Sequence, residues 1–364
     1  MRGPAAHKSV ASSGNPAAFA CVDGRADGSV SCRAGATDLG DDRLNLGFGP
    51  DLVDSMRRVL GERTADTRRR SHRRIEPSPI VWLTGPVVST STITSIRTLD
   101  GLHLAGTIVT PDQPPAHAAL LVHGGGVTRE EGGFFTRLAD GLAESGVASL
   151  RFDLRGHGDS EGRQEELTLS TILNDIRVAL AALRASTGAA ALSLLGASFG
   201  GGICAYYAAK RPDELTRLVL LNPQVDYKKR TIDSRPYWTN EVISDEAAQE
   251  LNQAGAIQFT PSLKHGRPLL NEVFWLKPNE VLGEIRTPTL IVHGNADTLV
   301  SIDGSRQALD QFTAPVELVE VDGSQHGFAV HDDPQYLNPK SQQYQVFVIE
   351  TVAQWLTTGS SGRS

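Results

Sequence analysis

The sequence predicts an α/β fold in which helices cover both faces of a mostly parallel β-sheet. Three observations support this prediction. From residue 117 onward, short apolar runs alternate with amphipathic stretches. Several of these runs are continuously apolar, which is typical of strands buried on both faces. A hairpin pattern precedes them, and such a hairpin is compatible with an antiparallel edge on an otherwise parallel sheet.

The predicted elements follow from the period of the apolar residues. The hairpin joins 93–97 to 102–108 around Asp100-Gly101, a turn dipeptide between two alternating segments. Continuously apolar runs then predict strands, and a 3.6-residue period predicts helices. The expected strands are 117–123, 147–152, 190–195, 215–221, 289–293 and 316–321, and the expected helices are 133–144, 168–184, 200–210, 301–312 and 344–356.

The 364 residues are enough for one large α/β domain with extensions. We predict a core over 86–222 and 279–358, followed by a disordered tail at 359–364. Between the two core segments, residues 223–278 are polar and aromatic and break the alternation. Unstructured loops of this length are uncommon inside compact domains and are usually functional. We therefore predict a cap or lid inserted at 223–278.

Residues 1–85 are predicted to form a poorly ordered N-terminal extension, because they show no sustained period. A short amphipathic piece at 51–60 predicts one helix there. The only strong basic cluster is Arg68–Arg74. A role of these arginines with RNA or at a membrane stays open, but no aromatic residues are interleaved for base stacking, and a solvated tail is favoured.

Composition limits the classes of protein to consider. The formal charge of −7 and a 40% hydrophobic content are ordinary for globular enzymes. No apolar run approaches the length of a membrane span, and the first thirty residues lack the order of a secretion signal. Three cysteines, Cys21, Cys32 and Cys204, predict neither a disulfide framework nor a zinc site. We expect a reducing, cytoplasmic setting.

The most informative motif is Gly196-Ala197-Ser198-Phe199-Gly200, which follows an apolar run and opens a helical segment. A strand, a G-x-S-x-G and a helix together predict a nucleophile elbow, in which Ser198 stands on a tight turn. The pattern is short, so a second interpretation stays open. In that interpretation, Ser198 is a turn serine that caps the next helix.

A serine hydroxyl becomes a good nucleophile only when a base takes its proton and a third group orients that base. His326 and Asp297 each follow a late predicted strand, and the order Ser, Asp, His occurs in one class of serine hydrolases. We predict Ser198, Asp297 and His326 as a catalytic triad. Asp226 is the competing acid, because it also follows a strand. Taken singly, His326 is a common loop histidine and Asp297 a common capping carboxylate.

Acyl transfer also needs donors aimed at the developing oxyanion. One predicted donor is the backbone N–H of Phe199, directly after the serine. The other comes from the glycine run that follows the strand 117–123, where the backbone can approach a substrate closely. Gly125 is our choice for this N–H, with Gly124 as the second. His123 is interpreted as a structural hydrogen-bonding residue.

Five motifs follow one another along the chain: His123–Gly126, Phe152–Gly162, Gly196–Gly201, His293–Asp297 and His326–Phe328. In this order they resemble the α/β-hydrolase superfamily, and within it the chain is similar to bacterial cinnamoyl/feruloyl-esterase-like and serine-aminopeptidase-type, lipase-like hydrolases. The resemblance covers about residues 93–357. It implies an α/β-hydrolase fold with an eight-stranded type of sheet and a structural turn at 155–158. Residues 1–85 have no counterpart in it.

The resemblance implies Ser198, Asp297 and His326 as the triad, and Gly125 and Phe199 as the oxyanion-hole donors. We expect hydrolysis of a small-molecule carboxylic ester through an acyl-enzyme, without a cofactor or metal and without a nucleic-acid or membrane partner. A thioesterase, a peptidase or amidase, and an acyltransferase are alternatives on the same triad. A non-catalytic binding protein is an alternative of another class.

The sequence indicates the substrate less clearly than it indicates the reaction. The aromatic residues of the predicted cap have two interpretations, a wall for an aryl or medium acyl group and a small core inside the cap. The basic residues beside them predict contact with an acidic substrate. The oligomeric state stays open.

Overall fold

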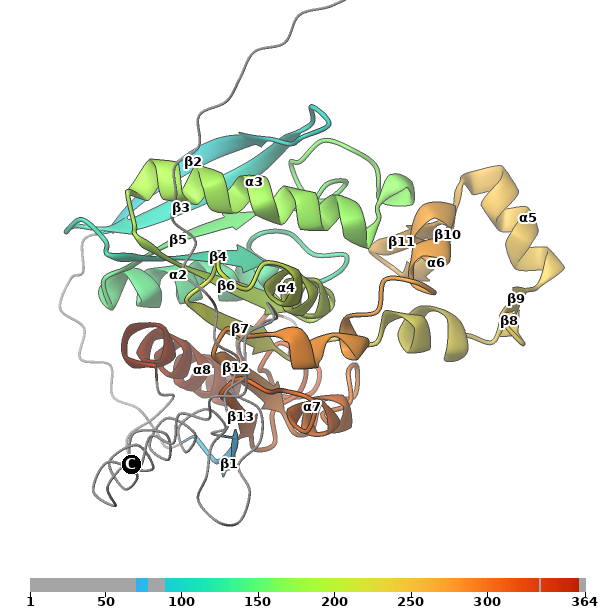
Figure 1. Ribbon diagram of the computed structural model, residues 1–364. Coiled ribbons are helices and arrows are strands. Elements are labelled where there is room, and N and C mark those ends of the chain that lie inside the picture. Colours follow the sequence, from blue (N-terminus) through green and yellow to red (C-terminus); the bar gives the residue numbers. More distant parts are fainter. Residues whose placement is uncertain (1–69, 78–88, 334, 360–364) are drawn as a thin grey trace, which may run out of the picture. The chain divides into compact units, whose positions relative to one another are not determined.

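The structure is a computed structural model that describes residues 70–77, 89–333 and 335–359, all within one compact unit (Leu60–Ser364). Its centre is a nine-stranded sheet (Figure 1). In spatial order the strands are β1 (Arg70–Ile75), β13 (Val316–Val321), β12 (Thr289–Gly294), β7 (Arg217–Leu221), β6 (Ala191–Ala197), β4 (His117–Val122), β5 (Val147–Phe152), β3 (His103–Pro111) and β2 (Ser89–Arg97).

The strand directions confirm the predicted mixed sheet. From β1 to β5 every neighbouring pair is parallel, and only β3 runs antiparallel to its two neighbours. The predicted hairpin is present, with Ile93 opposite Thr107. Because the strands from β13 to β5 are parallel, their carboxyl ends share one edge of the sheet, and residues that follow them meet there.

Helices cover both faces of the sheet, as predicted. Neighbouring residues of β4 show the two faces directly, because Leu120 packs in one fully buried apolar cluster and Leu121 in another. Helices α2 (Phe134–Glu144) and α8 (Pro339–Thr358) pack on the Leu121 face. The Leu120 face is covered by α3 (Leu169–Thr187), α4 (Phe199–Lys210) and α7 (Asp303–Leu309).

Helix boundaries differ most at the C-terminal end of the chain. The apolar period predicts a last helix from residue 344, whereas α8 begins at Pro339. Proline fits the first turn of a helix because its missing N–H needs no partner there. The side chain of Asn338 caps the helix by accepting from the N–H of Lys340 at 2.9 Å. None of the described helices is long and apolar enough to cross a bilayer.

An insertion, defined here as residues 222–288, separates β7 from β12 and lies to the right of the sheet in Figure 1. It has secondary structure of its own rather than being one long loop. Two hairpins, β8–β9 and β10–β11, are its only strands in the described part. Its elements are a π-helical turn (Lys229–Asp233), β8 (Trp238–Thr239), β9 (Val242–Ile243), α5 (Asp245–Ala254), β10 (Ala256–Thr260), β11 (Leu263–Gly266), α6 (Arg267–Glu272) and two 3₁₀ turns (Pro278–Glu280, Leu282–Glu284).

The prediction that residues 1–85 form a poorly ordered extension is wrong for residues 70–75. Residues 70–75 are not a solvated tail; they form β1, a ninth strand that pairs with β13 where eight strands were expected. Side chains of β1 meet carboxylates: Arg74 bonds Asp322, and Nε2 of His72 lies 2.5 Å from Glu320. The strand was missed because its side chains are polar and largely exposed, so no apolar alternation marks it. The predicted helix at 51–60 lies outside the described residues.

Candidate active site

Ser198 occupies a tight turn between β6 and α4. Its backbone has φ +49° and ψ −116°, a conformation that costs energy for a residue with a side chain. The flanking glycines are required by space. A Cβ at Gly196 would lie 2.6 Å from the carbonyl oxygen of Gly200, and a Cβ at Gly200 would lie 2.6 Å from that of His123. The hydroxyl of Ser198 makes no capping bond to α4, so the capping interpretation is not supported.

The three predicted triad residues are brought together. The Oγ of Ser198 lies 3.0 Å from Nε2 of His326, and Nδ1 of the same ring lies 2.6 Å from Oδ2 of Asp297. The competing acid is elsewhere: the carboxylate of Asp226 accepts from the N–H of Lys229 at 2.9 Å. The geometry therefore favours Asp297 as the acid that orients the imidazole.

The carboxylate of Asp297 is held in its ionised form by its surroundings. Burial alone would raise its pKa, but contacts with His293 and His326 and a backbone N–H hold the pKa well below its usual range. Its Oδ1 accepts from the N–H groups of Leu299 and Val300 at 2.8 and 2.9 Å. Its second oxygen is left for the two histidine rings.

The glycine run after β4 offers one free backbone donor. The N–H of Gly124 donates to the carboxylate of Glu131 at 2.8 Å, and the N–H of Gly126 donates to Nε2 of His157 at 3.2 Å. Among the described residues, no group accepts from the N–H of Gly125. The hydrogen bonds therefore distinguish Gly125 from Gly124, the second choice of the sequence analysis.

The other predicted donor, the N–H of Phe199, is the first amide of α4. The first amides of a helix have no partner within the helix, and within the described part of the chain this one has none outside it. The two segments adjoin, because a Cβ on Gly125 would lie 3.4 Å from Cβ of Phe199. Both amides thus lie on adjoining segments and have no acceptor in the described part of the chain.

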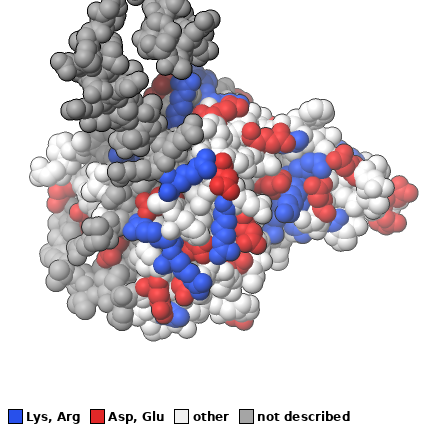
Figure 2. Space-filling model, turned by 60° about the horizontal axis from the view of Figure 1, so that its bottom comes forward, with Lys and Arg blue, Asp and Glu red and all other residues white. Residues whose placement is uncertain are grey.

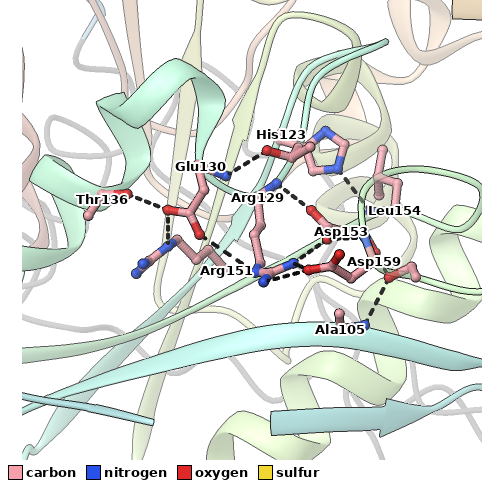
Figure 3. Close-up of polar contacts among 11 residues, drawn as sticks. Ala105, His123, Arg129, Glu130, Thr136, Arg151, Asp153, Leu154 and Asp159 are labelled. Atoms are coloured by element: carbon pink, nitrogen blue, oxygen red, sulfur yellow. Dashed lines mark hydrogen bonds and ion pairs between the residues drawn. The ribbon is translucent and has the colours of Figure 1, made fainter. Parts of the chain in front are cut away.

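A charged network anchors the loop that carries the glycine run (Figure 3). Arg129 forms ion pairs with the buried Asp153 and, at 3.0 Å, with Asp159. The Nε2 atom of His123 accepts from the N–H of Leu154 at 2.9 Å. Burial lowers the pKa of His123 to about 3, so this ring is neutral. These contacts support the structural role predicted for His123.

Glu131 is a residue of the site that the sequence analysis missed. Its backbone φ is +46°, which is uncommon for a residue with a side chain. Its carboxylate accepts from the N–H of Gly124, so the amide next to that of Gly125 is already occupied. Burial raises the pKa of Glu131. No period or motif in the sequence marks this glutamate.

The insertion contacts the site from two directions. On the oxyanion side, Leu263 of β11 lies so close that a Cβ on Gly125 would be 2.8 Å from its Cδ2 atom. On the acid side, Nη1 of Arg230 donates to the carbonyl oxygen of Leu299 at 2.8 Å. Leu299 is itself one of the two residues whose N–H groups hold Asp297. The insertion therefore borders both loops of the site.

Comparisons with known proteins show similarity to hydrolases. Residues 113–247 match a family model described as "Serine aminopeptidase, S33". The chain is 24% identical to a monoacylglycerol lipase of Mycolicibacterium smegmatis over 75% of its own length and 99% of that protein. A shorter stretch is 39% identical to the lipase LipV of Mycobacterium tuberculosis, over 29% of this chain and 37% of LipV.

Among solved structures, the chain is similar to Est1E from Butyrivibrio proteoclasticus with ferulic acid bound, with a TM-score of 0.58 and 22% identity over 71% of this chain and 99% of that one. It is also similar to the α/β hydrolase domain-containing protein 10 from mouse, with a TM-score of 0.57 and 17% identity over 74% of this chain and 100% of that one. At these identities the likeness concerns the fold.

Proposed function

Given that the chain is an α/β-hydrolase with esterase- and lipase-like relatives, we propose that it is a serine hydrolase that cleaves carboxylic esters through an acyl-enzyme. The observation that carries this proposal is the unbroken contact chain from Ser198 through His326 to Asp297. Such a chain makes a hydroxyl nucleophilic because the base and its orienting acid are both in place.

In the first half of the reaction, Nε2 of His326 takes the proton of Ser198 as Oγ attacks the ester carbonyl carbon. The negative charge moves to the former carbonyl oxygen, which accepts hydrogen bonds from the N–H groups of Gly125 and Phe199. When the intermediate collapses, His326 gives its proton to the departing alcohol, and the acyl group remains on Oγ.

In the second half, His326 takes a proton from water, and the resulting hydroxide attacks the acyl carbon. The acid leaves, and the proton returns to Oγ of Ser198. Asp297 remains ionised throughout. It accepts the Nδ1–H of His326, which keeps Nε2 available as the base and stabilises the imidazolium form.

We assign residues 223–278, which make up most of the insertion, as a cap over this site. Its contacts with the loops of Gly125 and Leu299 support this assignment, because they place it beside both catalytic loops. A cap that excludes water also strengthens the hydrogen bonds to the oxyanion.

The proposal is tested with a fluorophosphonate probe and a substrate panel of 4-nitrophenyl esters, thioesters and aminoacyl amides. We expect a covalent adduct that mass spectrometry of peptides places on Ser198, and ester turnover that falls by about 10⁴-fold or more in Ser198→Ala. Folding of the variant is checked by circular dichroism. Turnover confined to amides, or an ester rate that Ser198→Ala leaves unchanged, would contradict the proposal.

A further inference from the structure

Two arginines of the insertion have no carboxylate partner among the described residues. Arg230 lies in the π-helical turn, and Arg235 is two residues past the end of that turn. Neither forms an ion pair with an Asp or Glu in the described part of the chain, and the Nε atom of each is buried without a hydrogen-bond partner. Both residues are partly buried, and charged groups withdrawn from water are normally paired. The lack of a carboxylate beside them in the described part of the chain therefore needs an explanation.

Contacts place Arg230 beside the proposed catalytic acid. Its Nη1 atom donates to the carbonyl oxygen of Leu299 at 2.8 Å, and Leu299 donates its own N–H to Asp297. The charge of Asp297 favours the protonated form of Arg230. Arg230 thus lies within electrostatic reach of the triad without binding the triad carboxylate directly.

Arg235 is held beside Arg230 by an aromatic ring. Its guanidinium lies 3.7 Å from the ring centre of Phe259 on β10, and that of Arg230 lies 5.9 Å from the same centre. The hairpin that carries Phe259 is also the one that places Leu263 against Gly125. The two cations are therefore positioned by the same hairpin that borders the oxyanion loop.

A third group at this place also lacks a partner. The ring of His265 stacks on Phe259 at 4.1 Å and is 2% exposed, and neither of its nitrogens has a hydrogen-bond partner. Burial and the charge of Arg235 lower its pKa to about 3, so the ring is neutral. A neutral imidazole offers one N–H donor and one acceptor. The imidazole of His265 and the guanidinium groups of Arg230 and Arg235 thus all lie near the ring of Phe259.

This arrangement is costly unless an anion compensates it. Burial and the charge of Arg235 lower the pKa of Arg230, which means that its charge is disfavoured in the folded protein. Elsewhere the protein compensates such charges: Arg155, for example, bonds the buried carboxylate of Asp175 at 2.6 Å. A guanidinium matches a carboxylate or a phosphate with two parallel hydrogen bonds.

We propose that Arg230 and Arg235 form an anion subsite, and that the preferred substrates are esters that carry an ionised acid group besides the ester bond that is cleaved. The subsite rests on the proposed ester hydrolysis at Ser198. The ionised group is a carboxylate or a phosphate-type group, since both have the oxygen geometry that a guanidinium recognises.

Three 4-nitrophenyl esters of equal chain length test the subsite: the octanoate, the monoester of octanedioic acid, and an ω-phosphono analogue. A fourth, the octanoate of 3-carboxy-4-nitrophenol, carries the anion on the alcohol side. We expect kcat/KM of one anionic ester to exceed that of its neutral counterpart, and Arg235→Met and Arg230→Met each to lower this ratio by about 10- to 100-fold. The preferred ester identifies the acid group and its side.

The matched control is Arg267→Met, which removes an exposed arginine of the same insertion. It is expected to leave the anionic-to-neutral ratio unchanged. Arg235→Lys keeps the charge without the guanidinium fork and is expected to restore part of the ratio. Circular dichroism shows that each variant is folded, and the anionic-to-neutral ratio is taken within each variant, so that a general loss of activity cancels.

A binding measurement separates the subsite from the chemistry. Calorimetry on Ser198→Ala, with octanedioate and octanoate as ligands, is expected to show tighter binding of octanedioate that Arg235→Met abolishes. Equal kcat/KM for anionic and neutral esters, with Ser198-dependent turnover of both, overturns the subsite and leaves the proposed function standing. Absence of ester turnover contradicts the proposed function, and the calorimetry then decides the subsite alone.

Discussion

The two sides of the site differ in whether their arginines have carboxylate partners. On the sheet side, Asp297 has both oxygens occupied, and the loop network pairs Arg129 with Asp153. On the insertion side, Arg230 and Arg235 have no carboxylate partner in the described part of the chain. A paired arginine is preorganised, whereas an unpaired one can still bind an anion. The comparison suggests that the sheet side performs the reaction and the insertion side selects the substrate.

The arginines of β1 sharpen this contrast. They too form a cationic group, but Arg73 bonds Glu317 on the neighbouring strand β13, and Arg74 bonds Asp322 directly after that strand. Positive and negative side chains are interspersed on the face that Figure 2 shows. A basic cluster in the sequence therefore predicts no anion-binding surface when the fold supplies carboxylates opposite it. The insertion has no such carboxylates for its two arginines.

The largest expected effect concerns the sheet side. Replacing Asp297 by Asn leaves the shape of the site but removes the acceptor for the Nδ1–H of His326, and we expect kcat for ester hydrolysis to fall by about 10⁴-fold. Asp226→Asn is the matched control, and it should retain the rate within about threefold because its carboxylate only caps a turn. Steady-state kinetics on 4-nitrophenyl esters measures both. Equal losses in the two variants would refute the assignment of the acid.

A second prediction compares a paired with an unpaired arginine through stability. Arg155→Met leaves the buried carboxylate of Asp175 without its cation, and the free energy of unfolding should fall by about 3–5 kcal/mol. Arg230→Met leaves no carboxylate unpaired and should stay within about 1 kcal/mol of the wild type. Urea denaturation measures both. A loss in Arg230→Met as large as in Arg155→Met would show that Arg230 has a structural role.

A third prediction uses the pH dependence of stability at Glu131. Because the folded-state pKa of Glu131 is raised, the folded protein binds this proton more readily than the unfolded chain. Stability therefore decreases as the pH rises from the ordinary pKa of about 4.3 through the raised value. Glu131→Gln stays neutral and should have a higher Tm than the wild type at pH 8, with no advantage at pH 4. A difference in Tm that is independent of pH would rule out the buried charge as its cause.

The smallest expected effect lies at the β1 edge. Arg74 is 65% exposed and pairs with a carboxylate at the surface, so the attraction is weakened by water and salt. Arg74→Gln should shift the urea midpoint far less than Arg155→Met. If the shift approached that of Arg155→Met, β1 would contribute to the core as much as an inner strand does.

Much of the fold could be predicted from the sequence. The strand Val316–Val321 was predicted with its observed boundaries, and the family resemblance is confirmed by the comparisons. Strands and helices inside the core leave an apolar period because each buries a defined face. The exposed strand Arg70–Ile75 buries little apolar surface, so no such period marked it.

The sequence predicted the candidate site in less detail than the fold. The sequence nominated Ser198, Asp297 and His326, but it left Asp226 open as the acid and Gly124 open as a donor. Only the folded chain distinguishes them, through a carboxylate that meets His326 and an amide already used by Glu131. Glu131 had no signal in the sequence, because its role depends on a backbone turn with positive φ.

The sequence by itself determined the order of strands and helices, the tight turn at Ser198 and the types of residue that follow each strand, because these depend on local spacing and on the size of glycine. The tertiary structure decided which of those residues meet. His326 contacts Ser198, which is 128 positions away in the sequence, and Arg230 bonds Leu299, which is 69 positions away. Such contacts depend on how the sheet and the insertion pack, and the local spacing of residues does not predict that packing.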